Sequence, residues 1–143
     1  MLLVDTSVWS LALRRKKAEV LSGEQMLAAA LAQAIADARV AMIGPIRQEL
    51  LSGVKEAAQF EKLRSNLEHF RDEALLTADY EEAARLSNLC RTHGQQCVPA
   101  DILICAVAIR RDWTVLTADE DIKRSLRIIS ATKGKPTSHR RTT

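Results

Sequence analysis

Aromatic residues are scarce in this chain, and their scarcity limits how it can bind nucleic acid. Phe, Trp and Tyr together make up 3% of the 143 residues. Platforms that bind single strands stack successive bases on aromatic rings, so a platform of that kind is not expected here. No apolar run approaches the roughly 20 residues of a membrane span, and Asp5 interrupts the apolar start, unlike a secretory signal. We therefore expect no membrane association.

Cysteine is also sparse, which argues against a disulfide framework. The chain has three cysteines, Cys90, Cys97 and Cys105. An odd number of cysteines without secretory features predicts reduced thiols in the cytoplasm. Cys90, His93 and Cys97 lie close together in the sequence, but a fourth ligand for a zinc site is missing. Buried thiols are therefore the simpler interpretation.

The basic excess of the chain belongs mainly to its last residues. The formal net charge is +3, from 21 basic and 18 acidic side chains. Without the final stretch, the chain holds 17 basic and 18 acidic side chains; the basic residues of that stretch are Lys133, Lys135, Arg140 and Arg141. The length is typical of one globular domain. We expect a single domain over residues 1–130 and a basic, flexible tail over residues 131–143.

Short apolar runs alternate with longer segments of helical periodicity along the chain. This alternation predicts an α/β fold, with a mainly parallel sheet of four to five strands flanked by helices. The predicted strands are residues 1–4, 39–43, 74–77, 114–117 and 126–129. The predicted helices are residues 6–13, 23–37, 46–51, 56–69, 79–93 and 102–109, with a short helix or turn at 118–123.

Asp5 is the first candidate for chemistry, because it directly follows the first apolar run. Ligands of open α/β sheets bind at the carboxyl ends of the strands, where this carboxylate would lie. Asp is also a preferred N-cap residue, so Asp5 could instead cap a helix that begins near Thr6. The residues alone leave both interpretations open.

Other acids occupy comparable positions. Glu49 lies inside a predicted helix, Asp101 in the first turn of an almost wholly apolar helix, and Asp119 and Asp121 just after a predicted strand. Each has a structural alternative: Asp101 could complement a helix dipole, Asp119 or Asp121 could be an N-cap, and Glu49 could face solvent. Carboxylates that converge in one crevice repel one another unless a cation neutralises them. An all-oxygen set of ligands suits Mg²⁺ or Mn²⁺ rather than zinc or iron.

Three segments, in this order, carry a family resemblance: LLVDTSVWS, PIRQELLSGV and VPADILICAVAIRRDWTVLTADEDI. They resemble the PIN-domain ribonucleases, most closely the VapC-type toxin of bacterial VapBC toxin–antitoxin pairs, over residues 1–129. The resemblance implies a PIN-like three-layer sandwich. It places the family's acidic quartet, which holds one or two Mg²⁺ or Mn²⁺ ions, on Asp5, Glu49, Asp101 and Asp119.

The resemblance also implies supporting residues. Asp121 corresponds to a frequent fifth acid. Thr6 and Thr117 correspond to hydroxyl residues that assist either the metal-bound water or the phosphate of the substrate. Ile122 stands where family members often have Phe, a change that keeps an apolar anchor. Backbone contact with RNA has these candidates: Arg14, Arg15, Lys16, Arg47 and Arg110.

The function that the resemblance implies is a metal-dependent endoribonuclease that cleaves structured RNA, such as transfer or ribosomal RNA, to inhibit translation. A divalent ion held by carboxylates can activate water and stabilise the departing oxygen of a phosphodiester. The expected products carry a 5′-phosphate and a 3′-hydroxyl. The expected partners are a second copy of the chain and a small VapB-type antitoxin that plugs the acidic groove.

Two other classes stay open. One is a phosphatase or phosphotransferase with Asp5 as nucleophile, but haloacid-dehalogenase-like enzymes have a second Asp where this chain has Ser7. Receiver domains carry a phosphorylatable Asp after the third strand, a pattern that Thr77-Ala78-Asp79 matches only in part. The other class is a catalytically inactive PIN-fold module that binds RNA or a protein; the presence of all four acids argues against it.

Overall fold

Leu3 and Val4 are fully buried because their strand lies in the middle of the sheet. The structure is a computed structural model that describes residues 1–14 and 22–133, without the side chains of Arg14 and Ser22. Strands β1 (Leu2–Val4), β2 (Val40–Ala41) and β3 (Thr114–Leu116) form a sheet of order β2-β1-β3. Both neighbours run parallel to β1, with Leu3 opposite Ala41 on one side and Val115 on the other.

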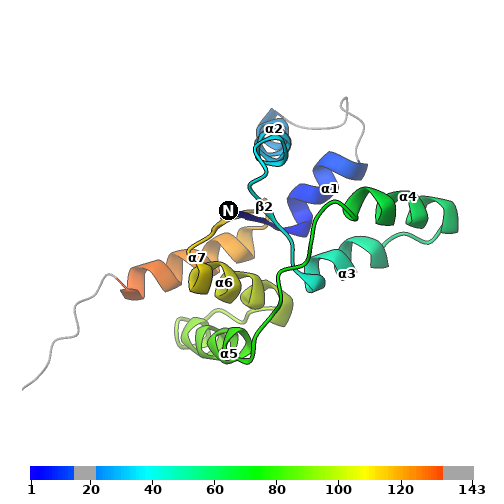
Figure 1. Cartoon of the computed structure of the whole chain (residues 1–143). Helices are drawn as coiled ribbons and strands as arrows, with labels where there is room; N and C mark the ends of the chain where they lie inside the picture. The colour runs from blue at the N-terminus through cyan, green and yellow to red at the C-terminus, as the bar shows by residue number, and fades with distance from the viewer. Residues whose placement is uncertain (15–21, 134–143) are drawn as a thin grey trace, which may run out of the picture.

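Seven helices surround this sheet in the described part of the chain. They pack in two groups, one made of α1, α2, α3 and α4 and the other of α5, α6 and α7 (Figure 1). Their bounds are α1 Thr6–Arg14, α2 Ser22–Ala36, α3 Gly44–Ser52, α4 Ala57–Leu67, α5 Thr77–Thr92, α6 Pro99–Arg111 and α7 Glu120–Lys133. The expected α/β fold, with a parallel sheet flanked by helices, is confirmed.

Helix α6 is the central helix of the second group. Seven consecutive residues, from Ile102 to Ala108, are buried, as its apolar sequence predicts. Pro99 begins the helix, and the left-handed conformation of Asp112 (φ 55°) ends it. This placement puts Asp101 in the first turn, at the end of α6 that precedes the buried residues.

The predicted strand over residues 126–129 is wrong, because these residues belong to α7. Ile122, Ser125 and Ile129 are buried on one face of this helix, with spacings of three and four residues. A four-residue apolar run fits a buried strand and a helix face equally well, so its periodicity could not separate the two.

The predicted strand over residues 74–77 is also wrong. Helix α5 already begins at Thr77, and the contact with the sheet comes earlier, as an isolated bridge between Met42 and Asp72. The Glu73 N–H donates to the Met42 carbonyl at 2.8 Å. Within the described residues the sheet therefore has three strands, not four to five.

The cysteines and the end of α5 agree with what the sequence predicts. All three cysteines are free, with Cys90 and Cys105 buried and Cys97 half-buried. Gly94 follows α5 with a positive φ of 78°, the conformation expected of a helix-ending glycine. In residues 1–14 and 22–133, no helix is long and apolar enough to cross a bilayer.

Candidate active site

Asp5 lies at the junction of β1 and α1, where it caps the helix and also stands at the expected edge of the sheet. Its Oδ2 accepts a hydrogen bond from the Ser7 N–H at 3.3 Å, which caps the first turn of α1. The same oxygen accepts hydrogen bonds from the Ser7 hydroxyl at 2.7 Å and the Thr117 hydroxyl at 3.0 Å. Asp5 is 4% exposed and sits at the carboxyl edge of the sheet.

The end of β3 is joined to the end of β1. The Asp5 N–H donates to the Leu116 carbonyl at 2.9 Å, which extends the strand pairing by one residue. Beyond it, the Ala118 N–H donates to Ser7 Oγ and the Asp119 N–H to Thr117 Oγ1, both at 2.9 Å. The segments that carry Asp5 and Asp119 are therefore held side by side.

Asp119 is the N-cap of α7, as its structural alternative proposed. Its Oδ1 accepts hydrogen bonds from the N–H groups of Asp121 at 2.8 Å and Ile122 at 3.2 Å. Asp121 lies in the first turn, exposed, with one oxygen 3.3 Å from the Arg124 guanidinium. Ile122 is fully buried, so it anchors this turn to the core.

Glu49 reaches the site from α3, which packs against α1. Its Oε2 accepts a 2.8 Å hydrogen bond from the hydroxyl of Thr6, the first residue of α1. Glu49 is exposed, so one oxygen is fixed by Thr6 while the carboxylate remains open to solvent.

The pKa of Asp101 is affected by the other four acids of the site. Its pKa is raised to about 6, first by burial and then, in decreasing order, by the negative charges of Asp119, Asp5, Glu49 and Asp121. The β1–α1 junction, α3 and the start of α7 therefore bring their carboxylates within electrostatic reach of the first turn of α6. The five acids that the sequence singled out therefore interact electrostatically, and we call the region around them the acidic crevice.

The donor chemistry of this crevice fits a divalent cation. Its ligand atoms are carboxylate and hydroxyl oxygens, which suit Mg²⁺ or Mn²⁺, and a cation would relieve the repulsion that acts on Asp101. Among the described residues, no three His, Cys, Asp or Glu side chains already surround a single point as ligands. Glu49 is turned toward Thr6 and Asp119 toward its own helix. The acids therefore suit a divalent cation by their ligand chemistry and their charge, while their side chains are not yet arranged around one point.

The basic candidates for RNA contact divide into two sets. Arg47 donates to Asp72 at 2.9 Å and to the carbonyls of Leu67 and Phe70, and the Arg110 guanidinium pairs with Asp79. These two guanidinium groups are therefore engaged within the protein. The others lie outside the described residues: the side chain of Arg14, and Arg15 and Lys16 entirely.

Asp79 does not behave as a phosphorylatable residue. Its side chain is fully buried, and both oxygens accept hydrogen bonds from Arg111, at 2.7 and 3.0 Å. The partial receiver-like pattern at Thr77-Ala78-Asp79 is thus explained by a buried ion pair.

The contacts of Ser7 were not predicted from the sequence, where this residue stands out only as a difference from the second Asp of haloacid-dehalogenase-like enzymes. In the structure, the Ser7 hydroxyl contacts both the Asp5 carboxylate and the backbone at the end of β3. A hydroxyl two residues after a strand-ending acid was a signal, but its partner lies 111 positions away in the chain.

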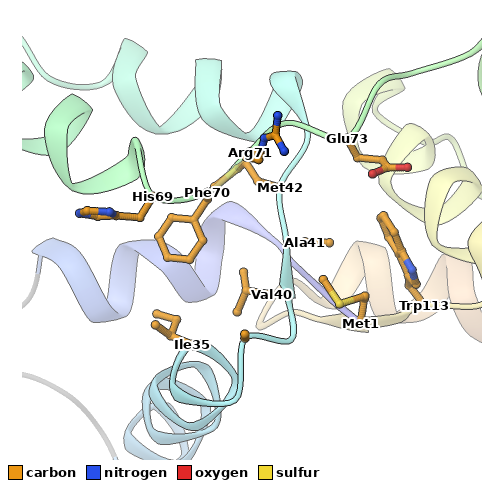
Figure 2. A pocket seen from close by; sticks show the side chains of 11 residues that line it. Met1, Ile35, Val40, Ala41, Met42, His69, Phe70, Arg71, Glu73 and Trp113 are labelled. Atoms are coloured by element: carbon orange, nitrogen blue, oxygen red, sulfur yellow. The ribbon is translucent and has the colours of Figure 1, made fainter.

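A separate hollow lies at the opposite edge of the sheet. It has a volume of about 410 Å³, and its lining includes Met1, Val40 and Trp113, which stand at the amino ends of the three strands. Figure 2 shows Val40, Met42 and Phe70 around it. None of the five acids lines this hollow, so it is distinct from the acidic crevice.

Comparisons with known proteins identify the fold and the family. No curated protein sequence matches the chain. The crystal structure of FitAcB from Neisseria gonorrhoeae is similar in fold, with a TM-score of 0.71 and 23% sequence identity, covering 89% of this chain and 94% of that chain. The family model described as PIN domain matches residues 2–125, and PIN domains are in general nucleases that use divalent metal ions. The chain therefore belongs to the PIN domain family.

Proposed function

We propose that this protein is a Mg²⁺- or Mn²⁺-dependent endoribonuclease and the toxin of a VapBC-type toxin–antitoxin pair. One observation carries the proposal: the negative charges of four acids, from the β1–α1 junction, α3 and the start of α7, act on Asp101 in the first turn of α6, at the carboxyl edge of a parallel sheet. An all-oxygen crevice of this charge is suited to a divalent ion and to phosphodiester chemistry. The PIN domain match supports the nuclease class.

The proposed ligands are Asp5, Glu49, Asp101 and Asp119, with Asp121 in support. A bound divalent ion supplies activation of water and stabilisation of the departing 3′-oxygen. The chain's own contribution is orientation: Ser7 and Thr117 fix Oδ2 of Asp5, and Thr6 fixes Oε2 of Glu49. Asp101 holds its proton to a higher pH than an ordinary Asp until the surrounding charge is neutralised.

The proposed substrate is structured RNA, either transfer or ribosomal RNA, cut to leave a 5′-phosphate and a 3′-hydroxyl. Such substrates are recognised mainly by shape and backbone contacts, so basic side chains around the crevice would provide affinity. We place the activity in the cytoplasm, where the three free thiols stay reduced. The proposed organisation is a PIN domain over residues 1–130 followed by a basic tail over residues 131–143.

Two protein partners belong to the proposal. The negative crevice favours an antitoxin of the VapB type that inserts a basic side chain among the carboxylates. A homodimer is supported by an apolar groove that includes Pro45, Tyr80 and Leu103, next to which Leu76 and Val98 are more than half exposed. Sedimentation analysis of the wild type and of a Tyr80→Glu variant would test this dimer, since the charge should shift the chain toward a monomer.

The decisive experiment compares RNA cleavage by the wild type with cleavage by Asp5→Asn and Asp101→Asn in Mg²⁺ and in EDTA. We expect both variants to lose cleavage while their circular dichroism stays that of a folded protein. Asp37→Asn is the matched control, because Asp37 is exposed and pairs with Arg39 outside the crevice. Undiminished cleavage by folded Asp5→Asn and Asp101→Asn would refute the assignment.

A second readout separates the alternatives. Induced expression of the wild type should arrest growth, and the ends of the RNA fragments should identify the RNA that is cut. If the wild type binds RNA but cleaves none in the presence of Mg²⁺ or Mn²⁺, the inactive PIN-fold module is the better description.

A further inference from the structure

The Ser7 hydroxyl joins two distant parts of the acidic crevice through a single atom. Ser7 Oγ donates a 2.7 Å hydrogen bond to Oδ2 of Asp5 and accepts a 2.9 Å hydrogen bond from the Ala118 N–H. Asp5 follows β1, and Ala118 directly precedes Asp119 after β3. The hydroxyl therefore links one proposed ligand to the backbone beside another.

A second hydroxyl completes the link from the other side. Thr117 Oγ1 donates to the same Asp5 Oδ2 at 3.0 Å and accepts the Asp119 N–H at 2.9 Å. With the Ser7 N–H at 3.3 Å, three donors converge on Oδ2 of Asp5. Among the described residues, no donor is assigned to Oδ1 of Asp5, so this oxygen remains available to a ligand.

The physical consequence concerns the orientation of Asp5. A carboxylate that rotates freely must be ordered when it binds an ion, whereas one already held by hydrogen bonds is pre-oriented. The serine and threonine hydroxyls also tie the Asp5 carboxylate to the turn that carries Asp119. Loss of the serine hydroxyl removes the shortest of the three hydrogen bonds to Oδ2 and the acceptor of the Ala118 N–H.

We propose that Ser7 is a positioning residue of the metal site, which directs Oδ1 of Asp5 into the crevice and fixes the spacing between Asp5 and the 117–119 turn. This inference rests on the proposed function, because it presupposes that Asp5 and Asp119 hold a divalent ion. Ser7 acts through Asp5 and the backbone, and its own hydroxyl is occupied by these two contacts.

The test measures Mn²⁺ binding directly, by the loss of the electron paramagnetic resonance signal of free Mn²⁺. We expect Ser7→Ala to raise the dissociation constant for Mn²⁺ by about tenfold or more, the usual effect of removing a partner that orients a ligand. Cleavage should fall most at limiting Mn²⁺ and recover largely at saturating Mn²⁺. Ser125→Ala is the matched control: Ser125 is a buried serine of α7 whose hydroxyl donates to the Asp121 carbonyl and accepts from Gln95.

An isosteric pair separates positioning from folding. Ser7→Thr keeps the hydroxyl and Ser7→Val replaces it with a methyl group at equal size, so Mn²⁺ affinity should be retained in the first and lost in the second. Wild-type affinity in folded Ser7→Ala or Ser7→Val would overturn the proposal and leave the nuclease assignment intact. Unfolding of both variants would make Ser7 a folding residue and overturn it equally. If the wild type binds no Mn²⁺ and cleaves no RNA, the proposed function fails, and this inference fails with it.

Discussion

Thr6 donates a 2.8 Å hydrogen bond to Glu49, a residue 43 positions further along the chain. The bond joins the first turn of α1 to α3 at the place where the acids gather. The family resemblance implies that Thr6 assists metal-bound water or the phosphate of the substrate. In the structure its hydroxyl proton is directed at the Glu49 carboxylate, so the effect of Thr6 on a ligand passes through Glu49.

This relationship predicts the effect of removing one hydroxyl. Thr6→Val should lower kcat/KM for RNA cleavage by about tenfold, because a hydrogen bond to a charged group contributes about 1.5 kcal/mol at the low end of its range. Thr6→Ser, which keeps the hydroxyl, should stay close to the wild type. Steady-state cleavage at fixed Mg²⁺ measures both, and equal rates for Thr6→Val and Thr6→Ser would show that this contact is unimportant.

Asp79 and Arg111 form an ion pair with two hydrogen bonds to a buried carboxylate, and this pair serves the fold rather than the site. The Asp79 side chain is fully buried between Arg111 and Arg110, and Oδ2 also accepts the Leu76 N–H at 2.7 Å. Asp79→Asn should cost about 1.5–3 kcal/mol of unfolding free energy, because it removes the buried anion that accepts hydrogen bonds from the partly exposed Arg111 and Arg110. Urea denaturation measures this loss.

The control for that loss is an exposed pair on the same helix. Glu82 and Arg85 lie 3.2 Å apart with side chains 26% and 63% exposed, so Glu82→Gln should change stability by less than about 1 kcal/mol. Cleavage by folded Asp79→Asn should remain near the wild-type rate. A loss of cleavage without a loss of stability would contradict the structural role.

The same pair fixes the sign of a pH effect. Hydrogen bonds from Arg111, with help from Leu76 and Arg110, hold the pKa of Asp79 well below its usual range despite burial. The stability that Asp79 contributes is therefore present above the ordinary Asp pKa and lost as the pH falls toward its folded value. The difference in unfolding free energy between the wild type and Asp79→Asn should stay constant from pH 5 to 8 and shrink in stronger acid.

Much of the site was predictable because its signals are local. A carboxylate after an apolar run, or in the first turn of an apolar helix, can be recognised from neighbouring residues, and in the structure Asp5 and Asp119 lie within electrostatic reach of Asp101. The two interpretations of Asp5 and of Asp119 were not true alternatives. A residue at a strand–helix junction can cap the helix and face the sheet edge at once.

The missed features depend on long-range contacts. Arg47 and Arg110 are ordinary cations in the sequence, and their partners Asp72 and Asp79 lie 25 and 31 positions away. The bond from Ala118 to Ser7 requires the register of β1 against β3, which no local pattern reveals. The misassigned strand over residues 126–129 fails for the opposite reason, since four apolar residues are too few to define a period.

The end of α7 decides where the tail can be tested. Ile129 is 3% exposed and α7 continues to Lys133, so truncation after Ile129 would cut into a packed helix. A chain that ends at Lys133 removes Lys135, Arg140 and Arg141 and keeps this helix. We expect its Mn²⁺ affinity and its RNA cleavage to match those of the full chain, because the proposed ligands all precede residue 122. Lost cleavage with retained folding and Mn²⁺ binding would show instead that the tail guides the substrate.

The carboxylate of Asp101 is a proposed metal ligand, and in the absence of a cation we expect its negative charge to destabilise the fold. Its folded pKa of about 6 lies above the ordinary value of 3.8, so the folded state favours the protonated carboxyl more than the unfolded chain does. Ionised Asp101 therefore lowers the free energy of unfolding. This loss of stability is absent in acid, appears as the pH rises from about 4 through 6, and is complete above that range. In EDTA at pH 7.5, Asp101→Asn should melt at a higher temperature than the wild type, and the difference should largely vanish near pH 4.

Mn²⁺ should raise the melting temperature of the wild type more than that of the variant, because the cation neutralises the repulsion that the substitution has already removed. A variant less stable than the wild type in EDTA at pH 7.5 would show that the acids do not repel one another as the structure indicates.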